Sequence, residues 1–255
     1  MTMVSRRELV NYLDNLLRLD DIPGDVSNNG LQVEGSDGVN KAVFAVDASL
    51  QLFEAAAAEH ADFIFVHHGI SWKDSLKYLT GVNASRCRAL FRNDISLYAC
   101  HLPLDCHPEL GHNALIADAL GLRERGTFYT YAGVPIGWYG TLPTPLPLEQ
   151  LEAEVNSRWN TVARVLAAGR PTVRTTGIVS GGGDGAIPDC QRLGLDCLIT
   201  GELSHENVHL AHEAGINVVA GGHYCTEVPG VQRVMEQVQR DYGLDSVFID
   251  LPTGY

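Results

Sequence analysis

Two adjacent histidines follow an apolar segment of this chain in a pattern that could bind metal ions. His67 and His68 come directly after the apolar run 62–66 and are followed by Gly69. Neighbouring residues of a regular strand point to opposite faces. A turn at Gly69 would let both imidazoles face one crevice, where each could bind one of two ions. The pair by itself fits a polar loop with two solvated histidines equally well.

A second group of residues adds a carboxylate. His101 and Asp105 follow the apolar run 95–100. Because Pro103 prevents a helix from starting at once, we expect Asp105 on a loop over the end of the sheet. A carboxylate can bridge two divalent cations, since each of its oxygens can face a different ion. His101 suits direct coordination and a role in orienting another ligand equally well.

The third group is His223 and Glu227, which are four residues apart. This spacing places two ligands on the same face of a helical turn. Gly221 and Gly222 precede them and keep side chains away from the approach to the metals. The pattern alone arises often by chance, but three such groups, each directly after an apolar strand, form a more specific signal.

These donors predict a catalytic metal centre. Three imidazoles and two carboxylates are too few to fill the coordination spheres of two ions, so a bridging water or hydroxide is expected in the open positions. Nitrogen and oxygen donors without thiolate favour Zn, Fe, Mn, Co or Ni over Ca or Mg. We therefore predict two divalent transition-metal ions per chain, with the ligands His67, His68, Asp105, His223 and Glu227.

Other polar residues are candidates for proton transfer. Glu202 and His205 follow the apolar run 196–200 and, with His101, could act as general acid or base or orient the ligands. Ser204 is predicted to cap the helix that follows. The glycine-rich run 181–185 could hold an anion or form a tight turn from strand to helix, and it lacks the ending of a P-loop.

Apolar runs alternate with helical periodicity along most of the chain. Ser5 to Glu8 form a capping box, and leucines at helical spacing follow. Strands are predicted at 41–46, 62–66, 95–100, 161–166, 174–180, 196–200, 216–220 and 246–250. Helices are predicted at 50–60, 84–93, 112–120, 148–158, 186–193, 204–214 and 227–241. This order predicts an α/β fold with mostly parallel sheets flanked by helices, which bind ligands beyond the carboxyl ends of their strands.

The pattern of residue types changes between residues 126 and 148. Aromatic residues there are interrupted by glycine and proline, which predicts short antiparallel strands and a crossover. We therefore expect an N-terminal α/β domain at 1–125 and a C-terminal α/β domain at 126–255, with a soft boundary that the chain can cross again.

Composition restricts the class of protein. The net charge is −13, from 31 acidic and 18 basic residues, which argues against nucleic acid as the main partner. No run is long and apolar enough for a membrane span, and the first residues lead into a helix without an apolar signal core. The six cysteines form no C-x-x-C pair and fit buried thiols in a reducing compartment. We expect a cytoplasmic protein without a membrane partner.

The blocks resemble the Nif-three-like family of dinuclear metal-centre proteins, often labelled as type-two-like GTP cyclohydrolases. The matching pieces, in family order, are Asn29–Val33, His67–Gly69, His101 with Asp105, Gly201–Glu202 with His205, and Gly221–Tyr224 with Thr226–Glu227. The resemblance implies two similar α/β domains with the metal pair between them, and a ring-shaped homohexamer. It assigns metal ligation to the same five residues. The chain departs from the family at Cys106–Pro108, where small residues are usual, so the local pocket shape is expected to differ.

Two functions remain open at this stage. The first is a metal-dependent hydrolase that acts on a small anionic or nucleotide substrate, by GTP ring opening or by phosphoester or amide hydrolysis. The second is a protein that stores, delivers or senses metal, or binds another protein, without catalysis. Open coordination positions and candidate proton-transfer groups favour the first. No base-binding or sugar-binding motif identifies the substrate.

Overall fold

Helix α1 (Arg6–Leu17) begins where the capping pattern predicts a helix. In the computed structural model, which describes residues 3–254, the Ser5 hydroxyl accepts a hydrogen bond from the backbone N–H of Glu8. Leu9, Leu13 and Leu17 form its buried face. Local capping and periodicity therefore define this helix as expected.

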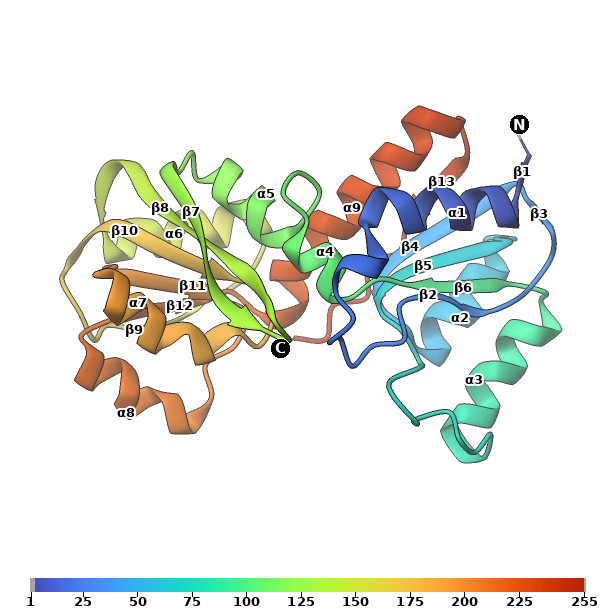
Figure 1. The fold of residues 1–255 in the computed structure, drawn as a ribbon, viewed down its shortest axis with the longest axis horizontal. Coiled ribbons are helices and arrows are strands. Elements are labelled where there is room, and N and C mark those ends of the chain that lie inside the picture. The colour runs from blue at the N-terminus through green and yellow to red at the C-terminus, as the bar shows by residue number, and fades with distance from the viewer. Residues whose placement is uncertain (1–2, 255) are drawn as a thin grey trace. The chain divides into compact units, whose positions relative to one another are not determined.

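The first compact unit comprises residues 3–104 and 230–251 and contains a five-stranded sheet (Figure 1). Its parallel strands lie in the order β13 (Asp245–Phe248), β4 (Lys41–Asp47), β5 (Phe63–His68) and β6 (Ser96–Ala99). An antiparallel strand, β2 (Gly30–Val33), lies beside β6. The short strands β1 (Val4–Ser5) and β3 (Gly38–Val39) form a separate pair. The unit also contains α2 (Leu50–Ala58), α3 (Gly81–Arg92) and the 3₁₀ helix η1 (Leu19–Asp21).

Both faces of the first sheet are buried. Ile64 and Val66 of β5 pack in one cluster with Phe53 of α2. Phe65 points to the opposite face, where its ring stacks on Tyr98 of β6 with centroids 5.7 Å apart. Burial on both faces explains why the strand is continuously apolar rather than alternating.

The second compact unit comprises residues 105–229 and 252–254 and contains a six-stranded sheet. The strand order is β7 (Arg123–Tyr131), β8 (Val134–Pro147), β10 (Thr172–Val179), β11 (Cys197–Thr200), β12 (Asn217–Ala220) and β9 (Arg164–Leu166). Strands β10, β11 and β12 are parallel, and the other neighbours pair antiparallel. The helices of this unit are α5 (His112–Ala119), α6 (Leu148–Trp159), α7 (Ile187–Leu193), α8 (His205–Ala214) and the 3₁₀ helix η2 (Gly183–Ala186).

The chain passes from one unit to the other at three points, one after Leu251 and two within further helices. These are α4 (Leu102–Cys106), divided after Leu104, and α9 (His223–Tyr242), divided after Pro229. The predicted α/β class is confirmed, and the second sheet is mixed rather than mostly parallel. The boundary expected near residue 126 lies inside strand β7, which pairs with β8 in the antiparallel arrangement predicted for this segment.

Most aromatic side chains of the β7–β8 hairpin are covered. Phe128 is buried and packs edge-on against Tyr139, and Trp138 packs against the apolar core of the second unit. Tyr131 is exposed. The aromatic composition of this segment therefore serves mainly its own packing. Within residues 3–254, no helix combines the length and apolar character needed to cross a membrane.

Candidate metal centre

His67 and His68 are the last two residues of strand β5. The sequence placed them past the strand end, but His68 still pairs with Asp47 of β4. Their rings nevertheless lie close, with centroids 4.5 Å apart. Side chains of a strand lean along its direction, and this brings two neighbouring imidazoles together at the carboxyl end.

Glycine is required at position 69 because neighbouring side chains approach its backbone closely, and not because the chain turns there. A side-chain carbon at this position would lie 2.3 Å from Gln32 Oε1 and 2.6 Å from the Ala99 side chain. The Gln32 amide oxygen accepts hydrogen bonds from the backbone N–H groups of Ile70 and Ser71. Gln32 therefore orders the segment after the two histidines, and only glycine leaves it room.

His101 joins this pair in the first unit. One ring nitrogen from each of His67, His68 and His101 lies within 4.8 Å of the others. The ring of Trp72 packs edge-on against His101, with centroids 5.0 Å apart. Three imidazoles at this spacing are a ligand set suited to a transition-metal ion.

An oxygen holds the Nδ1 atom of each of these three histidines. His67 Nδ1 lies 2.8 Å from the carbonyl oxygen of Cys100, His68 Nδ1 lies 2.8 Å from Asp47 Oδ1, and His101 Nδ1 lies 2.8 Å from Asp25 Oδ1. A carbonyl or carboxylate oxygen can only accept, so Nδ1 carries the proton. In the neutral ring, Nε2 then has the lone pair that binds a metal.

The buried side chain of Asp25 orients His101. One of its oxygens also accepts from the backbone N–H of Ser27, and the other accepts from Asn29 Nδ2 and from the backbone N–H of Leu102. Burial alone would raise the pKa of Asp25, but the hydrogen bond and charge of His101 outweigh it and lower the pKa to about 2. Asp25 is therefore an anion at neutral pH.

Sequence reasoning missed both supporting carboxylates. Asp47 follows the apolar run 41–46 directly, so the rule that polar residues at strand ends line ligand sites could have found it. Asp25 lies in a loop far from His101 in the sequence, and no local pattern marks it.

Asp105 lies in helix α4, not on the loop that the sequence predicted. Pro103 is in the first turn of this short helix. Backbone N–H groups of a first turn have no intrahelical partner, so proline, which lacks this N–H, costs no hydrogen bond there. Asp105 is buried, and its Oδ1 accepts a hydrogen bond of 3.2 Å from Ser180 Oγ. A ring nitrogen of His112 lies within 4.8 Å of an Asp105 carboxylate oxygen. His112 is fully buried at the start of α5, and sequence reasoning did not identify it as a candidate ligand.

His223 and Glu227 lie in the first turns of α9, as their spacing predicted. His223 Nε2 is 3.2 Å from Glu227 Oε1, and His223 Nδ1 is 2.6 Å from Glu202 Oε1. Burial would lower the pKa of His223, but the two carboxylates outweigh it and raise the pKa to about 9. Metal binding at His223 must therefore release a proton at neutral pH.

The glycine-rich run contributes to this part of the site through Gly181. Its φ of +61° favours glycine, and a side-chain carbon there would lie 2.3 Å from Glu227 Oε1 and 3.0 Å from His223 Nε2. The Gly181 carbonyl accepts hydrogen bonds from the backbone N–H groups of Gly201 and Glu202. The run is therefore packed against the two candidate ligands.

His205 differs from the other candidates. It is exposed at the first residue of α8, and the structure describes no hydrogen bond or ion pair from it to the candidate ligands within residues 3–254. Ser204 is the N-cap residue of α8, as predicted, but its hydroxyl donates to Asp184 Oδ2 and accepts from the side-chain amide of Asn207 rather than from a backbone N–H of the first turn. The role of His205 in proton transfer stays a prediction.

Comparisons of sequence and of structure with known proteins agree on one family. The sequence model of Duf34/NIF3 (NGG1p interacting factor 3) matches residues 4–253. The chain is 43% identical over 246 residues to the "GTP cyclohydrolase 1 type 2 homolog" of Archaeoglobus fulgidus, covering 96% of this chain and 98% of that protein. It is 40% identical over 251 residues to the protein of the same name in Deinococcus radiodurans, covering 98% and 95%. The crystal structure of TTHA1606 from Thermus thermophilus has a TM-score of 0.90 and 39% identity, covering 99% and 100%.

Replacing Gly181 should disturb the ligands that it touches. In Gly181→Ala, the added methyl group must displace the Glu227 carboxylate, so we expect metal affinity to fall roughly 10- to 100-fold, as for other changes to residues that position ligands. Competition with a chelator of known affinity measures this change.

Gly182→Ala is the matched control. A side-chain carbon at Gly182 would have no atom within 4 Å, and this neighbouring residue has negative φ. Wild-type metal affinity in both variants would contradict the role assigned to Gly181.

Proposed function

Because the chain belongs to the DUF34/NIF3 family, we propose that it binds two divalent transition-metal ions and uses them in a hydrolytic reaction. The supporting observation is the orientation of its imidazoles. In the first unit three histidines are held through Nδ1 by oxygen atoms, and in the second unit His223 is held in the same way by Glu202. In the first unit, Nε2 is then available to an ion or, at His101, to a proton, and Nε2 of His223 becomes available when metal binding releases its proton.

The proposed ligands are the five residues identified from the sequence. They are His67, His68, Asp105, His223 and Glu227. His112 is an additional candidate, because it offers a ring nitrogen close to Asp105. Imidazole and carboxylate donors without thiolate support Zn, Fe, Mn, Co or Ni as the ion.

The ions would supply an electrophile and lower the pKa of a water molecule, which is the chemistry that metal-dependent hydrolases use. The protein must then accept and return a proton. His101 suits this task because Asp25 fixes its proton on Nδ1 and would stabilise the imidazolium formed when Nε2 accepts another. Glu202 would act through His223, whose ring it orients.

The substrate is proposed by class only. The names of the relatives suggest hydrolysis of a nucleotide ring such as that of GTP, and phosphoesters and cyclic amides fit the same chemistry. A small anionic or nucleotide substrate is consistent with a centre whose ions reverse the local sign of an acidic protein. The alternative is a protein that stores, delivers or senses metal, or binds a partner protein, without turnover.

Metal analysis tests the ligands. Protein purified without chelator should contain close to two ions per chain, and Asp105→Ala and His223→Ala should each lose most of them. His212→Ala is the control, because His212 is an exposed residue of α8 and its removal should leave the metal content unchanged. Full metal content in both ligand variants would refute the assignment.

The assembly and location are further parts of the proposal. We expect a homohexamer in the cytoplasm. The six cysteines all lie within the described residues and form no disulfide with one another, which fits a reducing compartment. Light scattering should give the mass of six chains. A monomer at micromolar concentration would exclude this assembly.

Turnover separates an enzyme from a metal carrier. A screen of the metal-loaded protein against nucleotides, phosphoesters and cyclic amides must first find a substrate. On that substrate, His101→Ala or His205→Ala should retain the metals and reduce turnover by roughly a hundredfold or more, the usual effect of losing a general acid or base.

His209→Ala, which removes another exposed histidine of α8, should keep wild-type turnover and serves as the control. A metal carrier would instead show altered affinity or release, with any weak hydrolysis unchanged. If His101, Glu202 and His205 can each be replaced without loss of turnover, the proposed proton-transfer residues are wrong.

A further inference from the structure

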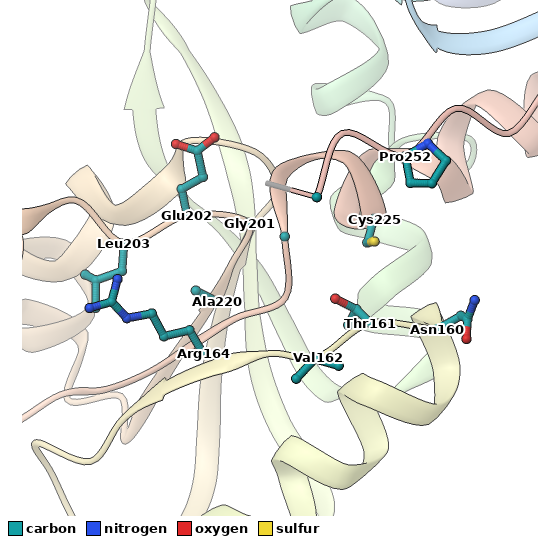
Figure 2. A pocket seen from close by; sticks show the side chains of 12 residues that line it. Asn160, Thr161, Val162, Arg164, Gly201, Glu202, Leu203, Ala220, Cys225 and Pro252 are labelled. Atoms are coloured by element: carbon teal, nitrogen blue, oxygen red, sulfur yellow. The ribbon is translucent and has the colours of Figure 1, made fainter.

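A cavity of about 620 Å³ lies in the second unit, beside the residues that hold His223 (Figure 2). Its walls include Gly201 and Glu202, which directly follow β11, and Ala220 and Gly222 at the end of β12. The carboxyl ends of neighbouring parallel strands are where α/β proteins bind small molecules. The volume suits a ligand of the size of a mononucleotide.

Arg164 supplies a positive charge to this cavity. Strand β9 pairs antiparallel with β12, and the pairing of Arg164 with Ala220 brings the arginine to the carboxyl end of β12. Figure 2 shows Arg164 and Leu203 on one side of the cavity and Asn160 on the other. Within residues 3–254, Arg164 forms no ion pair, although acidic residues outnumber basic ones by 31 to 18. An arginine without a carboxylate partner in so acidic a chain is available for an external anion.

The first turn of α9 forms another part of the cavity wall. Cys225 lines the cavity from this turn, whose backbone N–H groups lie at the positive end of a 20-residue helix. Glu202 also lines the cavity and carries the opposite charge. Its carboxylate accepts the hydrogen bond from His223 Nδ1, so this charge is already engaged.

Other walls of the cavity are apolar. Val162 is 93% exposed, which is unusual for a large aliphatic side chain, and Leu203 and Ala220 also face the cavity. Apolar walls with a few polar groups are typical of small-molecule sites, in which the walls bind the body of the ligand and the polar groups fix its orientation.

We propose that this cavity binds a small oxyanion-bearing molecule, with its phosphate or carboxylate at Arg164 and its body against Val162, Leu203 and Ala220. The inference rests on the proposed function, for which this molecule is the substrate. It adds that the substrate is recognised as an anion by a side chain of the protein itself, in addition to any contact with the metals.

Cys225 provides a direct measure of occupancy. It is half-buried in the cavity wall, and Cys106, the other half-buried cysteine, does not line this cavity and serves as the control within the same chain. Metal-loaded protein is alkylated with iodoacetamide, and both cysteines are followed by peptide mass spectrometry. The probes are two matched pairs, GMP with neutral guanosine and hippurate with neutral hippuramide.

We expect at least one anion to slow alkylation of Cys225 severalfold, with no effect on Cys106 and none from its neutral partner. Protection by GMP alone identifies a phosphate site, protection by hippurate alone a carboxylate site, and protection by both a general oxyanion site. In Arg164→Gln, half-protection should require roughly 10- to 100-fold more anion, the effect of losing a charge-assisted hydrogen bond. Arg170→Gln, which removes an exposed arginine outside the cavity, should behave as wild type.

The proposal is overturned if no probe protects Cys225, if neutral and anionic partners protect equally, or if Arg164→Gln is protected like the wild type. Metal content is measured on the same samples. Protection of Cys225 without bound metal would support the anion site and refute the proposed function. Two bound ions without protection would support the proposed metal site and refute the anion site.

Discussion

The hydrogen bond at Nδ1 of each site histidine is the interaction on which the candidate metal centre depends. An imidazole can present either nitrogen, and a free ring would divide its population between tautomers and rotamers. Oxygens of Cys100, Asp47, Asp25 and Glu202 fix the ring and its proton in this protein. The nitrogen proposed to bind a metal is therefore already oriented, which would reduce the entropy lost on binding.

These supporting oxygens come from elements that the sheets bring together. Asp47 and His68 are neighbours because β4 and β5 pair in parallel, and the Cys100 carbonyl reaches His67 because β6 lies on the other side of β5. The buried apolar residues of these strands keep the register fixed, since a shift by one residue would move every side chain to the opposite face. Packing far from the candidate ligands thus determines which of their atoms are available to bind an ion.

Charge is distributed unevenly around the candidate site. The buried carboxylates of Asp25, Asp105 and Glu227 lie against histidines or hydrogen-bond donors, while the chain as a whole carries a net charge of −13. Such a protein repels anions over most of its surface. In the proposed function, recognition of an anionic substrate would come from local positive groups, which are the proposed metal ions and, in the second unit, Arg164.

Local sequence determined most of the secondary structure and most of the candidate ligands. Capping at Ser5 and helical periodicity placed α1, continuous apolar runs placed the parallel strands, and polar residues after those runs identified His67, His68 and His223. These features depend on neighbours within a few residues, so they can be read from the chain. The loop predicted around Asp105 was wrong, because proline in the first turn of a helix costs no hydrogen bond.

The tertiary structure alone decided that Asp25 holds His101, that His112 lies beside Asp105, and that Gly181 packs against Glu227. Each of these pairs joins segments brought together by sheet pairing or helix packing. No local pattern specifies such a contact, because its stability comes from the burial of the whole unit.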